Sequence, residues 1–413
     1  MSRRITIVGA GQSGLQLALG LLDHGYQVRI VSNRTPEEIA AGRVASSQCM
    51  FDTPVGYERE VGAALWDDAP SVDGIGFTVP HPELAGEKAI SWAARLDRPA
   101  QSIDQRVKFP QLIELVVARG GRMVYEDAGV DDLERYTAED DLVLVAAGKG
   151  EIARLFERDA ERSTFDAPQR ALALTYVHGL TPDADFSKVA FNLIPGVGEY
   201  FVFPALTLTG PCHIMVFEGV PGGPMDRFAG GLTPEEHLEV SKDILRTFLP
   251  WEAERAEEAT LTDDLGVLQG RFAPTVRKPI ATLPSGRTVL GMADVVVLND
   301  PITGQGSNNA SRSAQSYLGS ILERGDLPFD DAWKTDAFET YWSVAEPVVS
   351  WTNAMLMPPP PHVLQLLGAA SAQPVIASRF ANGFDDPADF GEWFLDPAGA
   401  ETFLAEVMSG ERA

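Results

Sequence analysis

The pattern of apolar and polar positions predicts a strand, a tight turn and a helix at the start of the chain. Residues 4–8 form a β-branched run, and residues 15–22 carry apolar side chains at helical spacing. The turn Gly9–Gly14 between them has the glycine order GxGxxG. A dinucleotide-binding fingerprint requires this order between a strand and a helix, so the sequence predicts a site for FAD or NAD(P) here.

Each glycine of this turn has its own predicted role. Gly9 permits the tight turn, Gly11 lets the backbone approach a pyrophosphate, and Gly14 lets the helix pack on the strand. The helix N-terminus, which includes Gln12 and Ser13, offers unpaired N–H groups and a positive dipole end to the phosphates. All five residues are therefore candidate cofactor contacts.

The end of the second predicted strand, residues 27–31, bears on which nucleotide is bound. Many dinucleotide folds place an acidic residue there to bind the ribose, whereas this chain has Ser32, Asn33 and Arg34. Asn33 can still bind a ribose and Arg34 can meet a phosphate, but the missing carboxylate argues against a tight NAD site. Arg43 follows, where this kind of fold commonly contacts the ribityl-phosphate region of FAD; a solvated charge is the alternative.

The rest of the first domain has a weaker pattern. Residues 60–99 are poor in periodicity and rich in proline and glycine, so we expect a loop with short strands that leaves the nucleotide domain. A helix over 103–117, a short strand at 123–125 and a buried strand at 142–148 are expected to return to it.

Between residues 165 and 270 the pattern changes to short apolar or alternating runs separated by turn signals, which predicts an antiparallel sheet in a second domain. The expected strands are 171–177, 189–194, 199–203 and 213–218. Four phenylalanines on them either wall a substrate pocket or fill the sheet core. They are Phe191, Phe201, Phe203 and Phe217. Helices over 234–249 and 251–258 are expected to close this domain.

A second glycine-rich stretch favours FAD over NAD, because an NAD enzyme has no use for it. A buried strand from residue 288 leads to Asp294, whose carboxylate can bind the ribityl hydroxyls of a flavin. A glycine-rich loop then opens a helix whose N-terminus can present N–H groups to the pyrimidine edge of a reduced, negatively charged flavin. The predicted contacts are Pro301, Gly304, Gln305, Gly306, Ser307 and Asn308.

Composition indicates which partners and which kinds of catalytic site are unfavourable for this chain. The 413 residues carry a net charge of −26, which argues against nucleic acid and anionic membrane surfaces as partners. No apolar run is long enough to span a membrane. Without a secretory leader, Cys49 and Cys212 are expected as reduced thiols in a cytoplasmic protein. The six histidines are scattered, and the sequence predicts no metal site, no Ser-His-Asp triad and no cysteine nucleophile.

A set of short motifs spread over nearly the whole chain resembles a known family. They are Gly9-Ala10-Gly11-x-x-Gly14-Leu15, Arg43, Arg59-Glu60-Val61, Asp104-x-Arg106, Gly148-Lys149, Pro168-Gln169-Arg170-Ala171, Leu268-Gln269-Gly270, Asp300-Pro301-x-x-Gly304-Gln305-Gly306 and Trp351-Thr352-Asn353. The chain resembles the oxygenase component of two-component styrene and indole monooxygenases, which are FAD-dependent epoxidases of the p-hydroxybenzoate-hydroxylase fold.

Within that family the loop after Arg43 separates two groups. Styrene-type members carry Asn-Thr-Val-Ala-His, whereas this chain has Ser46-Ser47-Gln48-Cys49-Met50, which resembles the indole-type pattern. Ile75 and Ala100 stand where styrene-type members have Tyr and Ser, and this again resembles the indole group. Thr78 fits neither pattern.

The resemblance implies that a separate NADH-dependent flavin reductase supplies reduced FAD, which agrees with the single dinucleotide fingerprint in the sequence. The resemblance further implies a flavin C4a-hydroperoxide, whose distal oxygen would pass to the C2–C3 bond of indole or to a styrene-like alkene. The implied catalytic residues at the flavin edge are Ser46, Ser47, Gln48 and Met50. The implied substrate contacts are Ile75, Ala100, Phe191, Phe201 and Phe203, and Arg106 is a further implied cofactor contact.

The predicted fold class is therefore α/β. We expect a discontinuous Rossmann-like FAD-binding domain over 1–60, 100–165 and 271–328, with a β-sheet substrate domain over 61–99 and 166–270. Residues 329–413 are expected to form a helical C-terminal region, in which Pro361 stands in the first turn of a helix. A homodimer is possible.

Four other functions remain open from the sequence. One is a plain NAD dehydrogenase, which the strand end Ser32-Asn33-Arg34 disfavours. A styrene monooxygenase proper would share every motif except the loop after Arg43. A single-component aromatic hydroxylase would oxidise NAD(P)H by itself. A non-catalytic binding protein on the same fold, like the GDP-dissociation inhibitors, would bind no flavin, and Asp294 with the Gly304 loop weighs against it.

Overall fold

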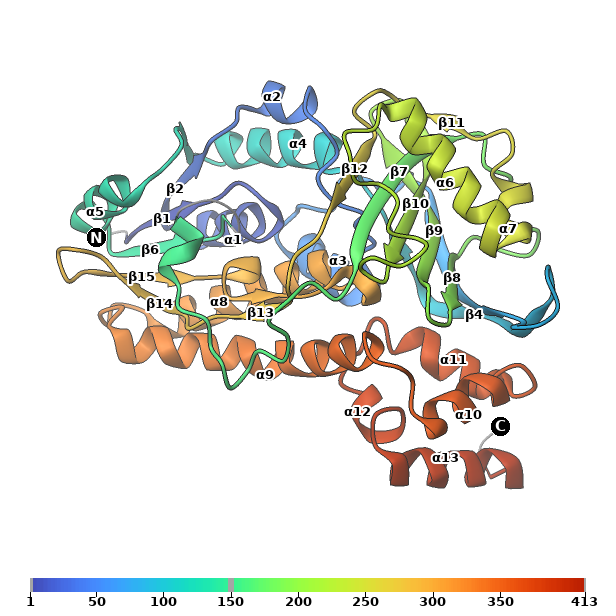
Figure 1. The fold of residues 1–413 in the computed structure, drawn as a ribbon. Helices are drawn as coiled ribbons and strands as arrows, with labels where there is room; N and C mark the ends of the chain where they lie inside the picture. The colour runs from blue at the N-terminus through green and yellow to red at the C-terminus, as the bar shows by residue number, and fades with distance from the viewer. Residues whose placement is uncertain (1–2, 148–151, 412–413) are drawn as a thin grey trace.

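Two β-sheets, each with its own helices, lie side by side in the computed structural model, which describes residues 3–147 and 152–411 (Figure 1). The first sheet has six strands in the order β14-β15-β6-β1-β2-β5. Its strands pair in parallel except for β14, which runs antiparallel to β15 at the edge. The bounds are β1 Arg4–Val8, β2 Gln27–Ser32, β5 Arg122–Tyr125, β6 Leu142–Val145, β14 Ile280–Thr282 and β15 Thr288–Gly291.

The predicted strand, glycine turn and helix at the N-terminus are confirmed. β1 leads through the turn into α1 (Gln12–Asp23). This helix packs against α4 (Gln105–Ala118) and α8 (Gly306–Arg324), and α8 packs on the long helix α9 (Asp331–Met355). The shorter helices of this part are α2 Pro36–Ala40, α3 Asp52–Glu60 and α5 Val130–Glu139. Helices thus cover the parallel sheet, and its strand β6 is accordingly a continuous buried apolar run.

The second sheet follows the order β11-β7-β10-β9-β8-β3-β4, with β12 also paired to β7. The four strands predicted between residues 165 and 270 are confirmed as β7 to β10. The bounds are β3 Ser71–Pro80, β4 Lys88–Gln101, β7 Ala171–His178, β8 Val189–Ile194, β9 Gly198–Thr207, β10 Gly210–Gly219, β11 Thr260–Leu261 and β12 Val267–Gly270. A two-stranded ribbon of β13 (Thr275–Val276) and β16 (Val297–Leu298) completes the strands.

Two expectations for this region are wrong. Residues 60–99 are not mainly loop, because β3 and β4 form a long hairpin that extends the second sheet. Glycine fits inside β3, since a Cβ at Gly74 would stand 2.3 Å from the Phe186 ring. The sheet is also not wholly antiparallel, because β3 pairs in parallel with β8. A parallel pair needs a long crossover, and here the chain passes through the first domain between the two strands.

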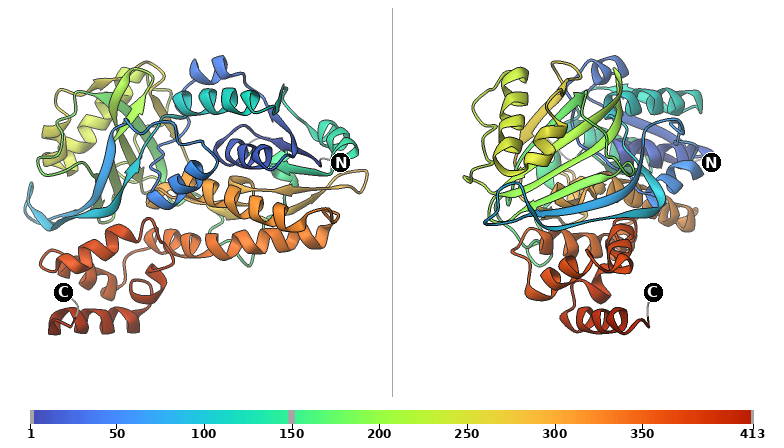
Figure 2. Two further views of the ribbon diagram at one scale, coloured as in Figure 1. Left: turned by 180° about the vertical axis from the view of Figure 1, so that it is seen from behind. Right: turned by 90° about the vertical axis from the view of Figure 1, so that its right-hand side faces the viewer.

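The C-terminal region is helical as predicted, and Pro361 stands in the first turn of its first helix. Its helices lie beneath the second sheet in Figure 1, and Figure 2 shows the same arrangement from two other sides. The bounds are α10 Pro361–Ala369, α11 Pro374–Asn382, α12 Phe390–Trp393 and α13 Pro397–Ser409.

The second sheet buries both of its faces. The inner face, defined as the one carrying Phe191 and Phe201, packs on the C-terminal helices. The outer face, which carries Tyr200 and Phe217, packs on α6 (Pro234–Phe248) and α7 (Pro250–Arg255). The second of these helices ends three residues earlier than the predicted 251–258. A separate apolar core surrounds the first sheet.

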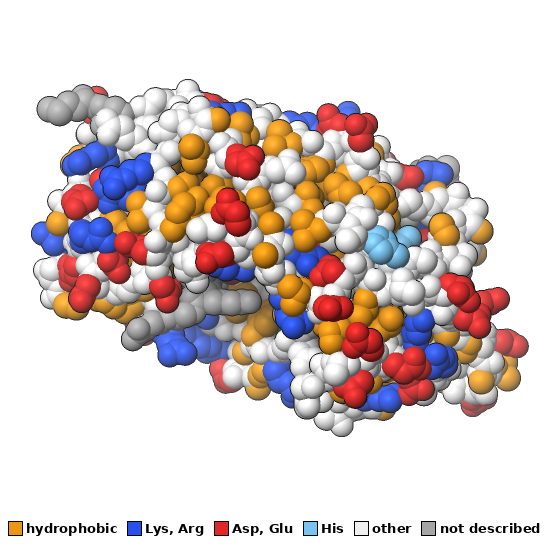
Figure 3. Space-filling model, turned by 90° about the horizontal axis from the view of Figure 1, so that it is seen from above, with side chains coloured by type: hydrophobic (Ala, Val, Ile, Leu, Met, Phe, Trp, Pro, Cys, Tyr) orange, Lys and Arg blue, Asp and Glu red, His pale blue; other side chains and the backbone are white. Residues whose placement is uncertain are grey.

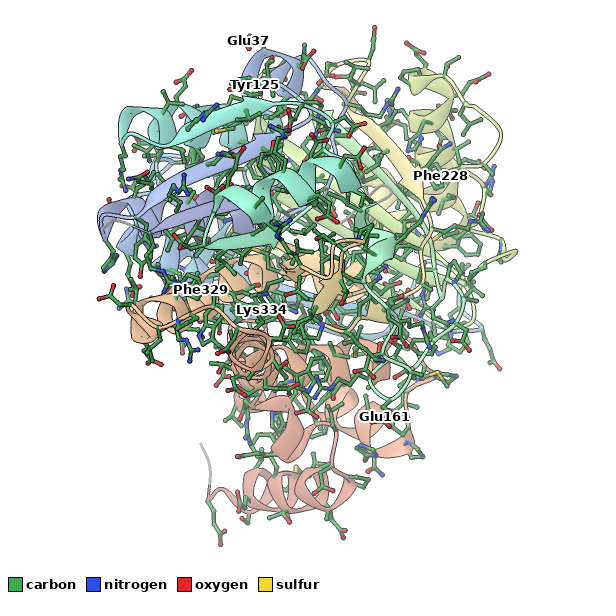
Figure 4. The ribbon with its side chains drawn as sticks, turned by 90° about the vertical axis from the view of Figure 1, so that its left-hand side faces the viewer. Glu37, Tyr125, Glu161, Phe228, Phe329 and Lys334 are labelled. Atoms are coloured by element: carbon green, nitrogen blue, oxygen red, sulfur yellow. The ribbon has the colours of Figure 1, made fainter. Side chains whose placement is uncertain are left out.

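The surface mixes charges of both signs. Acidic and basic side chains are interspersed with apolar ones on the face seen from above (Figure 3). Glu37 of α2 and Tyr125 of β5 lie close together at the edge of the first sheet (Figure 4), where burial and that carboxylate raise the pKa of the Tyr125 phenol. Within residues 3–147 and 152–411, none of the helices combines the length and apolar character needed to cross a bilayer.

Candidate active site

The glycine turn after β1 contains two tightly packed glycines and an open one. Gly9 has a φ of +126°, and a Cβ there would stand 2.7 Å from the Ala147 amide nitrogen. A Cβ at Gly14 would stand 2.1 Å from the Gly9 carbonyl oxygen. Gly11 differs, because a Cβ at this position would have no described atom within 4 Å. The backbone at Gly11 is therefore open to a ligand, as the approach of a pyrophosphate requires.

The first residues of α1 are held from below by a buried ion pair. Gln12 and Ser13 are both buried, and Gln12 Nε2 donates to Glu58 Oε1 at 2.6 Å. Glu58 is in turn paired with Lys108, with 2.5 Å between Nζ and Oε1. Buried charges need such pairing, so the pair fixes the Gln12 side chain beneath the turn. Neither Glu58 nor Lys108 belongs to a motif, so no local sequence signal marks them as part of the site.

The second glycine-rich stretch forms another open turn. A short 3₁₀ helix, η3 (Pro301–Thr303), ends at Gly304, whose φ of +64° is a left-handed conformation that glycine adopts at little cost. α8 begins at Gly306. A Cβ at either glycine would have no described atom within 4 Å. The N-terminus of a long helix, whose dipole favours negative charge, therefore faces open space here.

Asn308 joins this turn to the loop that precedes α3. Its Nδ2 donates to the Cys49 carbonyl oxygen at 2.8 Å and to that of Gly304 at 3.0 Å. Its Oδ1 accepts from the Phe51 amide at 2.9 Å. The side chain is fully buried, and its three hydrogen bonds place the two segments against each other.

The other predicted contacts of this turn lie differently. Gln305 is buried but directed towards the C-terminal region, because its Nε2 donates to the Phe384 carbonyl oxygen at 2.9 Å and its Oε1 accepts from Arg312 at 3.0 Å. Pro301 and Ser307 are half-buried. The neighbouring Asn309, which the sequence analysis passed over, is 2% exposed, and neither atom of its amide has a partner among the described residues.

The predicted charged and ribose contacts are spread around the first sheet. Asn33 and Arg34 are exposed after β2. Asp294 is also exposed, and it lies in the 3₁₀ turn η2 (Ala293–Val295) rather than at the end of β15. Arg43 reaches the second sheet, since its Nη1 donates to the Val267 carbonyl oxygen at 2.8 Å.

Arg106, predicted as a cofactor contact, instead makes its hydrogen bonds to side chains of the protein. It is 3% exposed, and its Nη1 and Nη2 each donate to an Asp263 carboxylate oxygen at 3.0 Å. Its Nε donates to Asp104 at 2.9 Å, and its Nη2 also donates to Thr207 at 3.1 Å. Arg106 therefore ties α4 to the second sheet. Gly148 and Lys149, two further motif residues, lie outside the described residues.

The implied catalytic loop lies against the inner face of the second sheet. The Tyr176 hydroxyl, on β7, donates to the Ser46 carbonyl oxygen at 2.9 Å and accepts from Gln48 Nε2 at 3.4 Å. Ser102 Oγ donates to the Gln48 carbonyl oxygen at 2.5 Å. Ser46 and Ser47 are half-buried, whereas Gln48 is 4% exposed. Tyr176 carried no sequence signal, because a tyrosine is ordinary in an apolar strand.

Met50 lies at the other end of this loop. It is buried, and its sulfur is 3.2 Å from Lys108 Nζ. Its backbone pairs with Gln101 at the end of β4. The loop thus connects the ion pair beneath the first glycine turn with the second sheet.

The five predicted substrate contacts belong to one apolar cluster. They are Ile75, Ala100, Phe191, Phe201 and Phe203. The rings of Phe191 and Phe201 are 4.5 Å apart. Val44, Cys49, Phe51 and Ile302 join the same cluster, so it reaches both the implied catalytic loop and the second glycine turn. The fourth phenylalanine, Phe217, does not belong to this cluster, so the expectation that it walls the same pocket is wrong. It lies on the outer face of the sheet, because successive side chains of a strand point to opposite faces.

The two open turns fit a flavin dinucleotide. Gly11 and Gly304 expose backbone at two helix N-termini, and Asn309 holds an unpaired donor and acceptor beside the second. Phosphates suit the first N-terminus and an electron-rich ring edge suits the second. Together with the apolar cluster beside them, they are the features of a flavoprotein fold.

Comparisons with known proteins agree with a flavoprotein fold. The model of the family described as styrene monooxygenase A putative substrate binding domain matches residues 148–255. Styrene monooxygenase StyA from Pseudomonas fluorescens is 30% identical over 408 residues, which are 96% of each chain. The crystal structure of a flavoprotein/dehydrogenase from Cytophaga hutchinsonii has a TM-score of 0.68 at 15% identity over the whole of both chains. That of the flavin-dependent brominase Bmp2 has a TM-score of 0.67 at 11% identity, covering 99% of this chain and 100% of the other.

The protein is a flavin-dependent monooxygenase of the oxygenase-component type. It belongs to the styrene monooxygenase family, because the similarity to StyA extends over nearly the whole chain. The family resemblance inferred from the motifs is thereby confirmed, whereas the assignment to the indole-type group stays a prediction.

Proposed function

We propose that this chain uses reduced FAD from a separate NADH-dependent flavin reductase, together with O₂, to epoxidise indole in preference to styrene-like alkenes. Reduced FAD, bound with its phosphates at Gly11 and its ring edge at Gly304 to Asn309, would supply the oxygen-transfer chemistry. Arg43 and Asp294 are proposed as outer contacts of the same cofactor. The protein then has to bind the substrate, orient it and exclude water.

The observation that carries the preference for indole is the free acceptor on Gln48. The Tyr176 hydroxyl uses its proton on the Ser46 carbonyl oxygen, so towards Gln48 it can only accept, and Nε2 is the donor. Gln48 Oε1 therefore points elsewhere, and it is buried with no partner among the described residues. A ligand N–H would satisfy it. Indole has such a donor and styrene has none.

The apolar cluster supports an aromatic substrate. Phe191, Phe201 and Phe203 project from two neighbouring strands, and Cys49 and Ile302 bring the loop and the turn to the same cluster. Aromatic rings pack well against such edges and faces. In this arrangement the phenylalanines hold the flat ring of the substrate. The hydrogen bond to Gln48 fixes how the ring is rotated within its own plane, and this rotation decides which bond of the ring faces the flavin.

Styrene is the second candidate substrate, because StyA, the relative that covers 96% of this chain, is named for it. A pocket that accepts indole by one hydrogen bond and apolar contacts can also take styrene, with that hydrogen bond unformed. The proposal is thus a ratio of kcat/KM values for the two substrates.

A reconstitution tests the two-component proposal. The purified chain is mixed with FAD, NADH and an unrelated flavin reductase, and indole and styrene are supplied in parallel. We expect indigo from indole only when the reductase is present. Styrene oxide with little indigo would contradict the preference, and NADH oxidation by the chain alone would point to a single-component hydroxylase.

The variant Gln48→Met tests the proposed acceptor. Methionine keeps a similar length without the amide oxygen, so the loss is expected for indole alone. An indole N–H that is buried without its acceptor corresponds to a loss of about tenfold in kcat/KM. We expect about this loss for indole and less than about threefold for styrene, which is the internal control. Equal losses for both substrates would refute the role of Gln48.

A further inference from the structure

Four ionisable side chains meet where the inner part of the second sheet approaches the second glycine turn. Arg170 and Glu199 form a bidentate pair, with Nε–Oε2 and Nη2–Oε1 distances of 2.6 and 2.9 Å. Glu218 lies beside Glu199, because the two residues are register partners on β10 and β9. Asp300 closes the cluster from the start of η3. All four residues are at most 8% exposed.

The cluster contains more negative charge than its arginine can balance. The two hydrogen bonds to Glu199 engage Nε and Nη2 of Arg170. Glu218 and Asp300 lie against each other, yet both carboxyl oxygens of Glu218 and Oδ2 of Asp300 have no donor among the described residues. Two ionised carboxylates in contact and out of water would repel strongly. A single proton between them removes one charge and provides the missing donor.

The Glu218–Asp300 pair lies between the second sheet and the second glycine turn. Asp300 also accepts from the Ile302 amide at 3.1 Å, so it caps the short helix that ends at Gly304. Glu218 is anchored in the middle of the sheet, with neighbours on both sides. A hydrogen bond between the two carboxyl groups therefore links the rigid sheet to the turn that precedes the N-terminus of α8.

We infer that Glu218 and Asp300 share one proton and that this carboxyl–carboxylate pair positions the turn 300–306 for the flavin. The pair acts through the turn, and its two members are positioning residues rather than catalytic ones. The inference rests on the proposed placement of the flavin at Gly304 to Asn309, and it deepens that proposal by naming what holds the turn.

The pair makes flavin binding sensitive to pH. Burial raises the pKa of Glu218 and that of Asp300, and the neighbouring Asp300 carboxylate raises the pKa of Glu218 further. Glu199 adds to this shift, whereas Arg170 opposes it. A raised pKa means that the shared proton is held at low and neutral pH and lost as the pH rises. Its loss leaves two adjacent negative charges, so the turn should be displaced in alkaline solution.

The variant Glu218→Gln tests the inference directly. Glutamine donates an N–H to the Asp300 carboxylate at any pH, so it replaces the shared proton by a permanent donor. We measure the affinity for oxidised FAD by quenching of its fluorescence between pH 6.5 and 9.5. The wild-type affinity should fall by about tenfold or more over this range, and that of Glu218→Gln by less than about twofold. Glu218→Ala, which leaves Asp300 Oδ2 without a donor, should bind FAD weakly throughout.

A matched control is Glu252→Gln. Glu252 is also a buried glutamate whose pKa is raised by burial, but it pairs with Arg255 on the outer face. It should keep the wild-type pH profile. If Glu218→Gln also keeps that profile, or if the wild-type affinity is flat with pH, the inference is refuted.

Hydrogen exchange separates the pair from the placement of the flavin. Without flavin, peptides that cover residues 299–309 should exchange faster at pH 9.5 than the intrinsic pH effect predicts, and Glu218→Gln should abolish this excess. Absence of the excess in the wild type refutes the shared proton. If the excess is present but the FAD affinity does not follow it, the shared proton is supported and the flavin is not at this turn. The conversion of indole or styrene does not enter either readout.

Discussion

The inner and outer faces of the second sheet are built from the same strands, yet they serve different ends. On β9, Phe201 faces inward and its neighbours Tyr200 and Val202 face outward. Both faces are closely packed, with Phe191 and Phe201 rings 4.5 Å apart inside and Tyr200 and Phe217 rings 4.9 Å apart outside. The inner cluster reaches the loop and the glycine turn of the candidate site, whereas the outer cluster ends at α6 and α7.

The difference between the faces shows what makes a buried aromatic residue functional. Both faces bury closely packed aromatic residues, so burial alone does not distinguish them. Helices cover both faces, but the inner cluster also reaches two irregular segments, the loop with Val44 and Cys49 and the glycine turn with Ile302, whereas the outer cluster does not. Orphaned polar atoms such as Gln48 Oε1 lie in these segments.

The largest expected effect on stability comes from two phenylalanine truncations, one on each face of the sheet. Phe201→Ala and Phe217→Ala should each lower the free energy of unfolding by about 3–5 kcal/mol, because each removes a buried ring. Only Phe201→Ala should also change the ratio of kcat/KM for indole and styrene. Thermal unfolding and parallel kinetics measure both quantities, and Phe201→Leu and Phe217→Leu give milder versions. If Phe217→Ala also changed the ratio of kcat/KM for the two substrates, the claim that only the inner face contacts the substrate would be wrong.

The next effect is a pH dependence that belongs to the outer face. Burial lowers the pKa of His237 to about 4, against partly opposing hydrogen bonds from its surroundings. The folded protein thus keeps this histidine neutral while the unfolded chain binds a proton below about pH 6.5. Stability should therefore fall as the pH falls from 6.5 towards 4, by on the order of 1–2 kcal/mol.

The variant His237→Leu isolates this contribution. It should flatten the acid side of the stability curve, as chemical denaturation at several pH values can measure. The activity ratio for indole and styrene should not change, since the ring packs against Phe228 on the outer face. An unaltered acid limb would show that other groups carry the acid sensitivity.

A smaller effect is expected from two buried tyrosines. Tyr176→Phe removes the hydrogen bonds to Ser46 and Gln48 and should cost about 1 kcal/mol of stability. Tyr200→Phe on the outer face removes a buried hydroxyl that has no partner among the described residues, so it should be neutral or stabilising. Urea denaturation distinguishes the two signs. A loss of equal size in both variants would mean that the Tyr200 hydroxyl is hydrogen-bonded in solution.

The last prediction concerns the reactivity of the two cysteine thiols in the native protein. Cys49 and Cys212 both belong to the inner cluster, and burial raises the pKa of each to about 12. Since the thiolate is the reactive form, the native protein should react slowly with a disulfide reagent at pH 8, and the denatured protein should react quickly at both sites. Fast modification of Cys49 in the native state would show that the inner face opens to solvent.

Much of the fold follows from local sequence signals. The first strand, turn and helix, the parallel strands, the strands β7 to β10 and the helical tail were all predictable, because apolar periodicity and glycine turns act over short distances. The β3–β4 hairpin was not. Gly74, Gly76 and Pro80 suggest a loop, and it is packing by Phe186 and Lys188, far along the chain, that makes glycine suitable there. The parallel pairing of β3 with β8 likewise depends on the path of the chain between them.

The candidate site divides in the same way. The sequence by itself determined the two glycine turns, the family and the residue types of the loop after Arg43, since short motifs encode them. Only the tertiary structure decided that Gln48 Oε1 has no partner among the described residues, that Arg106 pairs with Asp104 and Asp263, and that Glu218 meets Asp300. Hydrogen-bond partners and buried charges depend on residues far apart in the chain, and no local pattern can specify them.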